Sequence, residues 1–240
     1  MGYRDSSAAE KTALSGMLPE EIDAVCALPQ RFQSLQIFQW IARGCSSFEE
    51  MTNLPRKERE RLAGAYTPRT TVCETILKDP DGTVKLGIGL HDGSSIETVL
   101  LFDKAARRTA CVSCQVGCPM GCTFCQTGQL GCLRNLAPYE IVEQFLHLEQ
   151  ICGKLDNIVF MGMGEPLLNL DSIAKTIAVL THPKGRNLSH RRITLSTSGI
   201  CKGIYELADR QLDIRLAVSL TTADEALRTS LMPVTKTNPL

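Results

Sequence analysis

The sequence predicts an α/β protein, in which an incomplete (βα) barrel of parallel strands follows an N-terminal helical accessory domain and a β-meander. In the second half of the chain, short apolar strand-like runs alternate with amphipathic helical segments, and such repeats build a parallel sheet with right-handed crossovers. In the middle of the chain, Asp-Gly turn signals separate three β-like runs. We therefore expect a helical accessory domain over 1–66, a meander linker region over 67–104 and the barrel core over 105–240.

The accessory domain is expected to contain two main helices, over 20–28 and 30–43, because apolar residues recur there at helical spacing. Ser47 and Glu50 form a capping-box pattern at the start of a further turn. Short turns join the β-like runs of the meander, so these runs should pair as hairpins. They span 72–77, 83–90 and 95–102.

The core should contain four strands, which are too few to close a parallel barrel. Two of its helices have polar residues at their expected starts. Asp171 is the expected N-cap of one helix, and Thr222 with Glu225 forms a capping box for another. The other expected elements of the core are strands at 109–116, 157–163, 193–197 and 216–220 and helices at 138–152 and 202–210.

The charge balance excludes a global basic field, because 26 Lys and Arg residues are matched by 26 Asp and Glu residues. Contact with RNA would therefore require a local patch. The candidate is a basic run between a helix and a strand, acting together with the helical unit; the alternative is a solvated loop. The run contains Lys184, Arg186, His190, Arg191 and Arg192.

The chain begins with polar residues and contains no run near the ~20 apolar residues that a membrane-spanning helix needs. We expect neither a signal peptide nor a membrane anchor, and a cytoplasmic protein. Eleven cysteines, an odd number, argue against a disulfide framework and favour metal or redox chemistry.

The cysteines concentrate in one segment, where Cys118, Cys122 and Cys125 follow a predicted strand at close spacing. Thiolates are the usual ligands of iron–sulfur clusters. Three cysteines on one loop can bind three irons of a [4Fe–4S] cluster and leave the fourth iron open to a small molecule. Two alternatives are a set of free thiols and a structural zinc site. The zinc ligands would be four of Cys111, Cys114, Cys118, Cys122 and Cys125.

Polar or glycine-rich motifs occur where the next three strands end, at 162–166, 196–199 and 219–221. Glycines allow a ligand to approach the backbone, and the carboxylate of Glu165 can accept a hydrogen bond from an ammonium group. Hydroxyl groups at the other two strand ends suit a polar cofactor. The alternatives are a tight strand-to-helix turn for the glycines and ordinary helix caps for the hydroxyl residues.

Taken together, these motifs resemble the radical S-adenosylmethionine methyltransferases that methylate carbon 2 of adenine in 23S ribosomal RNA and, in dual-specificity members, in tRNA. Weaker resemblance extends through the helical unit and the meander, so it covers nearly the whole chain. The barrel would then be an incomplete radical-SAM core. The matching motifs lie at 111–118, 122–125, 134–136, 161–169 and 191–199.

The resemblance implies a role for each matching residue. The cluster ligands would be Cys118, Cys122 and Cys125. Glu97 corresponds to a proton acceptor, although composition alone suggests a solvated strand residue, and Cys111 corresponds to a thiol that helps resolve the enzyme–RNA adduct. The S-adenosylmethionine contacts would be Gly164, Glu165, Ser196, Ser219, Leu220 and Thr221.

Some positions depart from the family pattern. Thr221 stands where the family commonly has His, which weakens that contact, and Cys114 and Cys132 receive no role.

The implied partners are 23S rRNA, tRNA and an electron donor such as flavodoxin, with the protein a monomer and no membrane involved.

The family's mechanism also uses a methyl-carrying cysteine in the C-terminal third, whereas the last cysteine here is Cys201. We therefore expect that this 240-residue polypeptide does not methylate adenine by the family's route and exposes sheet edges. The alternatives are an inactive or truncated RNA-binding remnant and a radical-SAM protein with another reaction, such as cofactor cleavage without methyl transfer.

Overall fold

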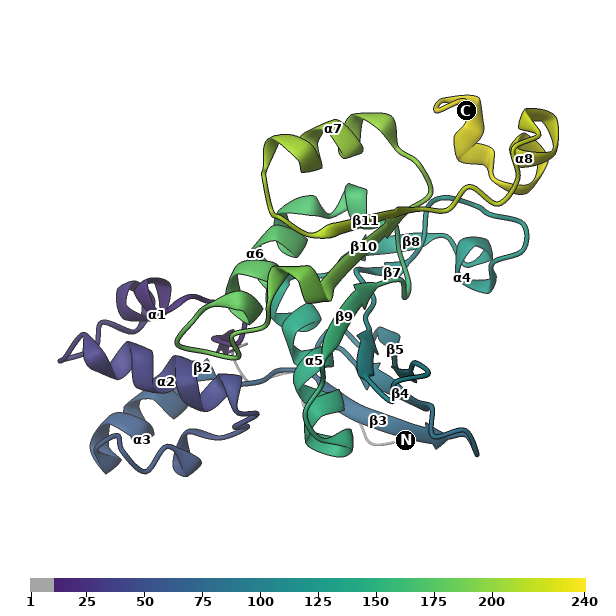
Figure 1. Cartoon of the computed structure of the whole chain (residues 1–240). Helices are drawn as coiled ribbons and strands as arrows, with labels where there is room; N and C mark the ends of the chain where they lie inside the picture. Colours follow the sequence, from purple (N-terminus) through teal and green to yellow (C-terminus); the bar gives the residue numbers. More distant parts are fainter. Residues whose placement is uncertain (1–10) are drawn as a thin grey trace.

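The computed structural model describes residues 11–240, so the first ten residues of the predicted accessory domain lie outside the described part. The central element is a seven-stranded sheet with the order β11-β10-β9-β6-β5-β4-β3 (Figure 1). Its strands are β3 (Val72–Lys78), β4 (Val84–Gly89), β5 (Ser95–Phe102), β6 (Arg108–Cys111), β9 (Asn157–Phe160), β10 (Ile193–Thr197) and β11 (Arg215–Val218).

Strand β6 joins two halves of different type. It pairs antiparallel with β5 and parallel with β9, so the antiparallel meander and the four parallel strands form one continuous sheet. The sheet has two edges, β3 and β11, and does not close into a barrel within residues 11–240. The predicted fold class, an α/β protein with an incomplete parallel barrel, is confirmed. The three domain boundaries stay a prediction.

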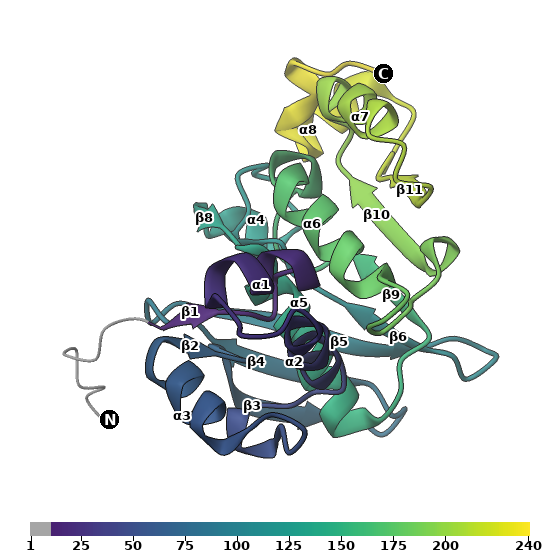
Figure 2. The ribbon, with the colours of Figure 1, turned by 90° about the vertical axis from the view of Figure 1, so that its left-hand side faces the viewer.

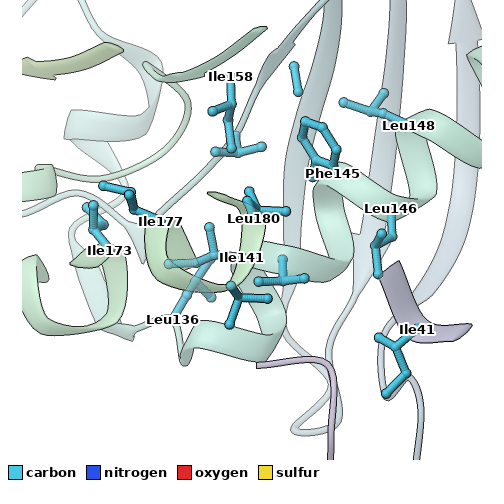
Figure 3. Packing of buried hydrophobic residues seen from close by; sticks show 14 of the residues in the cluster. Ile41, Leu136, Ile141, Phe145, Leu146, Leu148, Ile158, Ile173, Ile177 and Leu180 are labelled. Atoms are coloured by element: carbon cyan, nitrogen blue, oxygen red, sulfur yellow. The ribbon is translucent and has the colours of Figure 1, made fainter. Parts of the chain in front are cut away.

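Helices pack on one face of this sheet (Figure 2). Helix α5 (Pro138–Cys152) lies against β5 and α6 (Leu170–Thr181), and α7 (Cys201–Asp209) follows β10. Pro138 occupies the first turn of α5, where its missing N–H is not needed, and the Glu140 carboxylate accepts from the Ala137 N–H. Figure 3 shows Phe145 of α5 packed in the apolar core near Ile158 of β9. Burying a side chain such as Phe145 stabilises the fold by about 1.5–3 kcal/mol.

The helical unit contains α1 (Pro19–Cys26), α2 (Phe32–Ala42) and α3 (Arg56–Ala65), with the two short strands β1 (Thr12–Ala13) and β2 (Tyr66–Thr67). The predicted capping box is confirmed, because the Ser47 hydroxyl accepts from the Glu49 N–H and the Glu50 carboxylate accepts from the Ser47 N–H. The unit is tied to the core by the buried Glu143 of α5, whose carboxylate accepts from the Ser15 hydroxyl at 2.6 Å and from the Thr71 N–H at 2.7 Å.

The predicted strand at 109–116 is wrong in one respect, since the structure breaks it in two. Strand β6 ends at Cys111, and β7 (Gln115–Gly117) pairs with β8 (Cys132–Asn135) in a separate two-stranded sheet. The break occurs because the Ser113 N–H donates to the Gln144 side chain, and the Cys114 N–H donates to the Met163 carbonyl. These bonds draw the chain away from the seven-stranded sheet.

Two predicted helix caps are also wrong. Helix α6 begins after Asn169, whose side-chain amide donates to the carbonyls of Cys114 and Leu136, and Asp171 lies in the first turn instead. Helix α8 (Glu225–Leu231) begins after Asp224, whose carboxylate accepts from the Leu227 N–H at 2.8 Å. Thr222 accepts from the Asp224 N–H and so stabilises only the preceding turn.

Candidate functional site

The cysteine loop runs from β7 to the short helix α4 (Gln126–Gln129). It begins at Gly117, where φ is +84° and a Cβ atom would collide with the Gly131 carbonyl, so only glycine fits. The Cys118 N–H then donates to the Gly131 carbonyl at 2.7 Å, and the Thr123 N–H donates to the Leu231 carbonyl at 2.9 Å. The residue before β8 and the end of α8 therefore hold the loop from two sides.

The loop forms one wall of a hollow of about 320 Å³ at the carboxyl ends of β9, β10 and β11. All three cysteines of the predicted cluster site line this hollow, as do four of the predicted cofactor contacts. Parallel strands bring their carboxyl ends to one edge of the sheet, which explains why motifs far apart in sequence meet here. The predicted residues that line the hollow are Cys118, Cys122, Cys125, Gly164, Glu165, Ser196 and Ser219.

Gly164 and Glu165 form the part of the hollow that follows β9. Gly164 has φ +107°, and a Cβ atom there would lie 2.7 Å from the Gln115 Cβ and 2.8 Å from the Cys114 Sγ. The carboxylate of Glu165 is 3% exposed and accepts from the Ser198 N–H and hydroxyl and from the Leu167 N–H. A carboxylate offers about four acceptor positions, so this arrangement leaves room for one further donor.

The hydroxyl groups of Ser196 and Ser219 lie 3.4 Å apart across β10 and the end of β11. Leu220 and Thr221 are exposed and do not line the hollow. Thr221 has φ +66°, and its hydroxyl donates to the Met232 sulfur at 3.1 Å, so it faces α8 in this structure. The cofactor roles of all of these residues stay predictions.

Glu97 and Cys111 lie near one another on one face of the sheet. Cys111 pairs with Val99, which points to the same face as Glu97, two residues earlier on β5. The Glu97 carboxylate is half exposed and forms an ion pair with the Lys85 ammonium at 2.9 Å. Burial raises the pKa of the Cys111 thiol. Neither residue lines the hollow, and their proposed catalytic roles stay predictions.

The three cysteines fit a [4Fe–4S] cluster in their chemistry. All three thiols are free, and Cys122 and Cys125 lie near enough to Cys118 to help raise the pKa of its thiol. Burial raises the pKa of Cys118 and Cys122, so these thiols ionise readily only when a metal replaces the proton.

Within residues 11–240, no three Cys, His, Asp or Glu side chains lie close enough to bind a single metal ion. A cubane binds each thiolate to a separate iron, so its ligands lie farther apart than those of one ion. Of the cysteines considered for a zinc site, Cys111 and Cys114 do not line the hollow, and Cys114 is 2% exposed.

Sequence reasoning missed Arg228, on α8. Its guanidinium donates to the carbonyls of Ser198 and Leu220 and to the hydroxyl of Thr235, at 2.6–3.0 Å. It therefore connects the carboxyl ends of β10 and β11, both of which border the hollow. The only available signal was an Arg inside a predicted helix, and such residues are ordinarily exposed.

The predicted RNA-binding run is wrong at Arg186. Its guanidinium pairs with the Glu149 carboxylate at 2.8 Å, donates to the Leu155 carbonyl and lies over the Phe145 ring, so it is a structural residue. Arg191 and Arg192 are exposed, but they lie at the start of β10, at the opposite edge of the sheet from the cysteine loop. A role in RNA binding for the exposed cations stays a prediction.

Two models of known protein families match this chain. The radical SAM superfamily model matches residues 112–238, and the model of the ribosomal RNA large subunit methyltransferase N-terminal domain matches residues 26–67. The chain belongs to the radical SAM superfamily. None of the helices within residues 11–240 is long and apolar enough to cross a membrane.

Individual relatives show to which family within this superfamily the chain is similar. The probable dual-specificity RNA methyltransferase RlmN of Treponema denticola is 65% identical over 230 residues, which cover 96% of this chain and 66% of the relative. Its counterpart in Moorella thermoacetica is 46% identical, and the match covers 95% of this chain and 68% of that relative. A crystal structure of a radical SAM methyltransferase from Sphaerobacter thermophilus superposes with a TM-score of 0.89 at 38% identity, over 95% of this chain and 69% of that one.

The chain therefore belongs to the family of these RNA methyltransferases. It spans 65% of the length of its Treponema pallidum relatives and 66% of the Treponema denticola relative.

Proposed function

We propose that the protein is a radical S-adenosylmethionine methyltransferase that methylates carbon 2 of adenine in 23S rRNA and tRNA. The observation that carries this proposal is the convergence of three free thiols, Gly164–Glu165 and two serine hydroxyl groups on one hollow at the carboxyl ends of parallel strands. The printed names of the relatives, dual-specificity RNA methyltransferases, support RNA as the substrate.

In this proposal, Cys118, Cys122 and Cys125 would hold the [4Fe–4S] cluster and would leave one iron for the cofactor. When bound, the cluster and S-adenosylmethionine supply radical chemistry that amino-acid side chains cannot perform. The glycine at 164 lets the cofactor approach the backbone, because no Cβ occupies that space. The remaining acceptor position of Glu165 suits the ammonium group of the cofactor, which fixes its orientation.

The residues on the sheet face would act on the RNA. Glu97 would accept a proton at its carboxylate, which is half exposed and held in place by an ion pair with the Lys85 ammonium. Cys111 would supply the thiol that resolves the enzyme–RNA adduct. The two side chains lie on neighbouring strands of the same face, so one bound nucleotide could meet both.

The partners follow from this chemistry. An electron donor such as flavodoxin would reduce the cluster, and the protein would act as a monomer. The cytoplasm is the proposed compartment, because eleven cysteines, free throughout the described residues, require a reducing environment.

The proposal is tested by joining this chain to the C-terminal third of a family member and incubating the fusion anaerobically with RNA, reductant and labelled S-adenosylmethionine. Digestion to nucleosides should yield 2-methyladenosine, which should be lost in Cys118→Ala. Loss of the proton acceptor in Glu97→Gln should reduce the rate by about 10²–10⁴. Loss of the resolving thiol in Cys111→Ala should also lower the yield. The matched control is Cys152→Ala, a thiol at the end of α5, far from the hollow. A fusion that contains a cluster and binds RNA but gives no methylated adenine would contradict the proposal.

A further inference from the structure

In the described part of the chain, Arg228 is a buried cation without a carboxylate partner. Its side chain is 3% exposed, and no Asp or Glu among residues 11–240 lies within ion-pair distance of it. Its guanidinium donates only to neutral groups. These are the carbonyls of Ser198 (2.7 Å), Leu220 (3.0 Å) and Ser219 (3.4 Å) and the hydroxyl of Thr235 (2.6 Å).

Neutral acceptors satisfy the N–H groups of a guanidinium but do not neutralise its charge. A buried charge is destabilising unless an opposite charge lies nearby, and the penalty amounts to several kcal/mol for an ion removed from water. The partly buried Arg186, by contrast, has such a partner in Glu149. Within residues 11–240, the buried positive charge of Arg228 therefore has no carboxylate in contact with it.

The hollow next to Arg228 is lined by acidic rather than basic side chains. Ser198 and Ser219, whose carbonyls accept from Arg228, both line it, and no Lys or Arg side chain within residues 11–240 does. Its ionisable lining consists of Glu165 and the three cysteines. A [4Fe–4S] cluster with three thiolate ligands carries net negative charge in both of its usual oxidation states, so it would supply the counterion.

We propose that Arg228 is a positioning residue that holds the ends of β10 and β11 around the cofactor and supplies the buried positive charge that favours the reduced cluster. The proposal rests on the proposed function in requiring the cluster. Reduction adds one electron to an already anionic group, so a fixed cation beside it stabilises the reduced form and raises the reduction potential. The forked hydrogen bonds are a separate contribution, because they fix Ser198 and Ser219.

Two substitutions separate charge from geometry. Arg228→Lys keeps the charge but loses the planar fork, and Arg228→Gln keeps a hydrogen-bonding group but loses the charge. Each variant of the full chain is reconstituted anaerobically with iron and sulfide. The readouts are iron and sulfide content, the reduction potential from a redox titration followed by electron paramagnetic resonance, and the dissociation constant for S-adenosylmethionine. Lys202→Gln, an exposed cation on α7, controls for the loss of one charge.

We expect a lower reduction potential in Arg228→Gln than in wild type, and a wild-type potential in Arg228→Lys and Lys202→Gln. Both Arg228 variants should bind S-adenosylmethionine roughly tenfold more weakly, the effect of about one lost hydrogen bond. An unchanged potential in Arg228→Gln would overturn the proposal. If Arg228→Gln does not fold, the test falls to Arg228→Lys, which retains the positive charge. A reduction potential below that of wild type in Arg228→Lys would overturn the proposal. A wild-type chain that takes up no cluster would instead contradict the proposed function.

Discussion

The Glu165 carboxylate accepts two hydrogen bonds from Ser198, one from its N–H and one from its hydroxyl, both at 2.7 Å. Glu165 follows β9 and Ser198 follows β10, so this pair fixes the two strand ends relative to each other. Hydrogen bonds to an ionised acceptor are about twice as strong as neutral ones, and both residues are buried. The pair therefore makes one rigid corner of the hollow.

Ser198→Ala should lower the free energy of unfolding by about 1–3 kcal/mol, because a buried carboxylate loses one of its donors. It should also weaken S-adenosylmethionine binding several-fold, since Glu165 then moves more freely. Chemical denaturation and equilibrium binding to the reconstituted chain measure the two effects. Ser189→Ala is the control, an exposed serine whose side chain makes no capping bond. Equal behaviour of the two variants would contradict the structural role of the pair.

Gly164→Ala should reduce stability and abolish cofactor binding. The φ of +107° is strained for alanine, and the new Cβ would collide with the Cys114 sulfur, which together should cost about 1–3 kcal/mol or more. Gly93→Ala is the control that introduces backbone strain without a steric collision. Gly93 also has positive φ (+82°), but nothing lies within 4 Å of the position of its Cβ. Thermal unfolding and S-adenosylmethionine titration should show a smaller stability loss and normal binding in the control. Normal S-adenosylmethionine binding in Gly164→Ala would refute the proposal that the cofactor approaches the backbone at Gly164.

His147 should make the protein less stable as the pH falls below neutral. Burial, together with the charge of Arg69, lowers the pKa of His147 from 6.5 to about 4. Between these values the unfolded chain binds a proton that the folded chain does not, so the free energy of unfolding decreases as pH falls from 6.5 to 4. The contribution is on the order of 3 kcal/mol over this window. Below about pH 4 no further loss should come from this residue.

The measurement is urea denaturation at several pH values for wild type and His147→Gln, and the variant should show the shallower dependence. Burial raises the pKa of the neighbouring Glu143, which contributes with the opposite sign, but that contribution is present in both proteins. Parallel curves for the two proteins would show that His147 does not titrate differently on folding.

Arg186→Ala should destabilise the fold by about 3–5 kcal/mol, because it leaves the largely buried Glu149 carboxylate without its partner. Arg191→Ala, at an exposed position of the same basic run, should change stability by less than about 0.5 kcal/mol. Denaturation midpoints compare the two. A small effect at Arg186 would mean that the residue is exposed in solution and available to RNA, as the sequence first suggested.

The parts of the fold that depend on local pattern could be predicted from sequence. The bounds of β5 and α5 match the predicted ranges 95–102 and 138–152, because alternating burial defines the strand and Pro138 marks the helix start. The convergence of the cysteine loop and the strand-end motifs was also predictable, since parallel strands share one carboxyl edge.

Features that depend on tertiary contacts were not predictable. The chain leaves the sheet after Cys111 because Ser113 bonds to Gln144, a residue 31 positions away. Arg186 looked exposed beside other basic residues, and only the approach of α5 reveals its partner Glu149. Arg228 gave only the weak signal of an Arg inside a predicted helix, because its role arises where α8 meets the ends of two strands.

The most direct test of the central claim is anaerobic reconstitution of the chain, with metal analysis and electron paramagnetic resonance before and after addition of S-adenosylmethionine. We predict brown, oxygen-sensitive protein with iron and sulfide in equal amounts, and a reduced-cluster signal that changes when S-adenosylmethionine binds the open iron. The signal should be lost in Cys118→Ala, Cys122→Ala and Cys125→Ala and retained in Cys152→Ala. Colourless protein with stoichiometric zinc, or a cluster signal that S-adenosylmethionine leaves unchanged, would contradict the account.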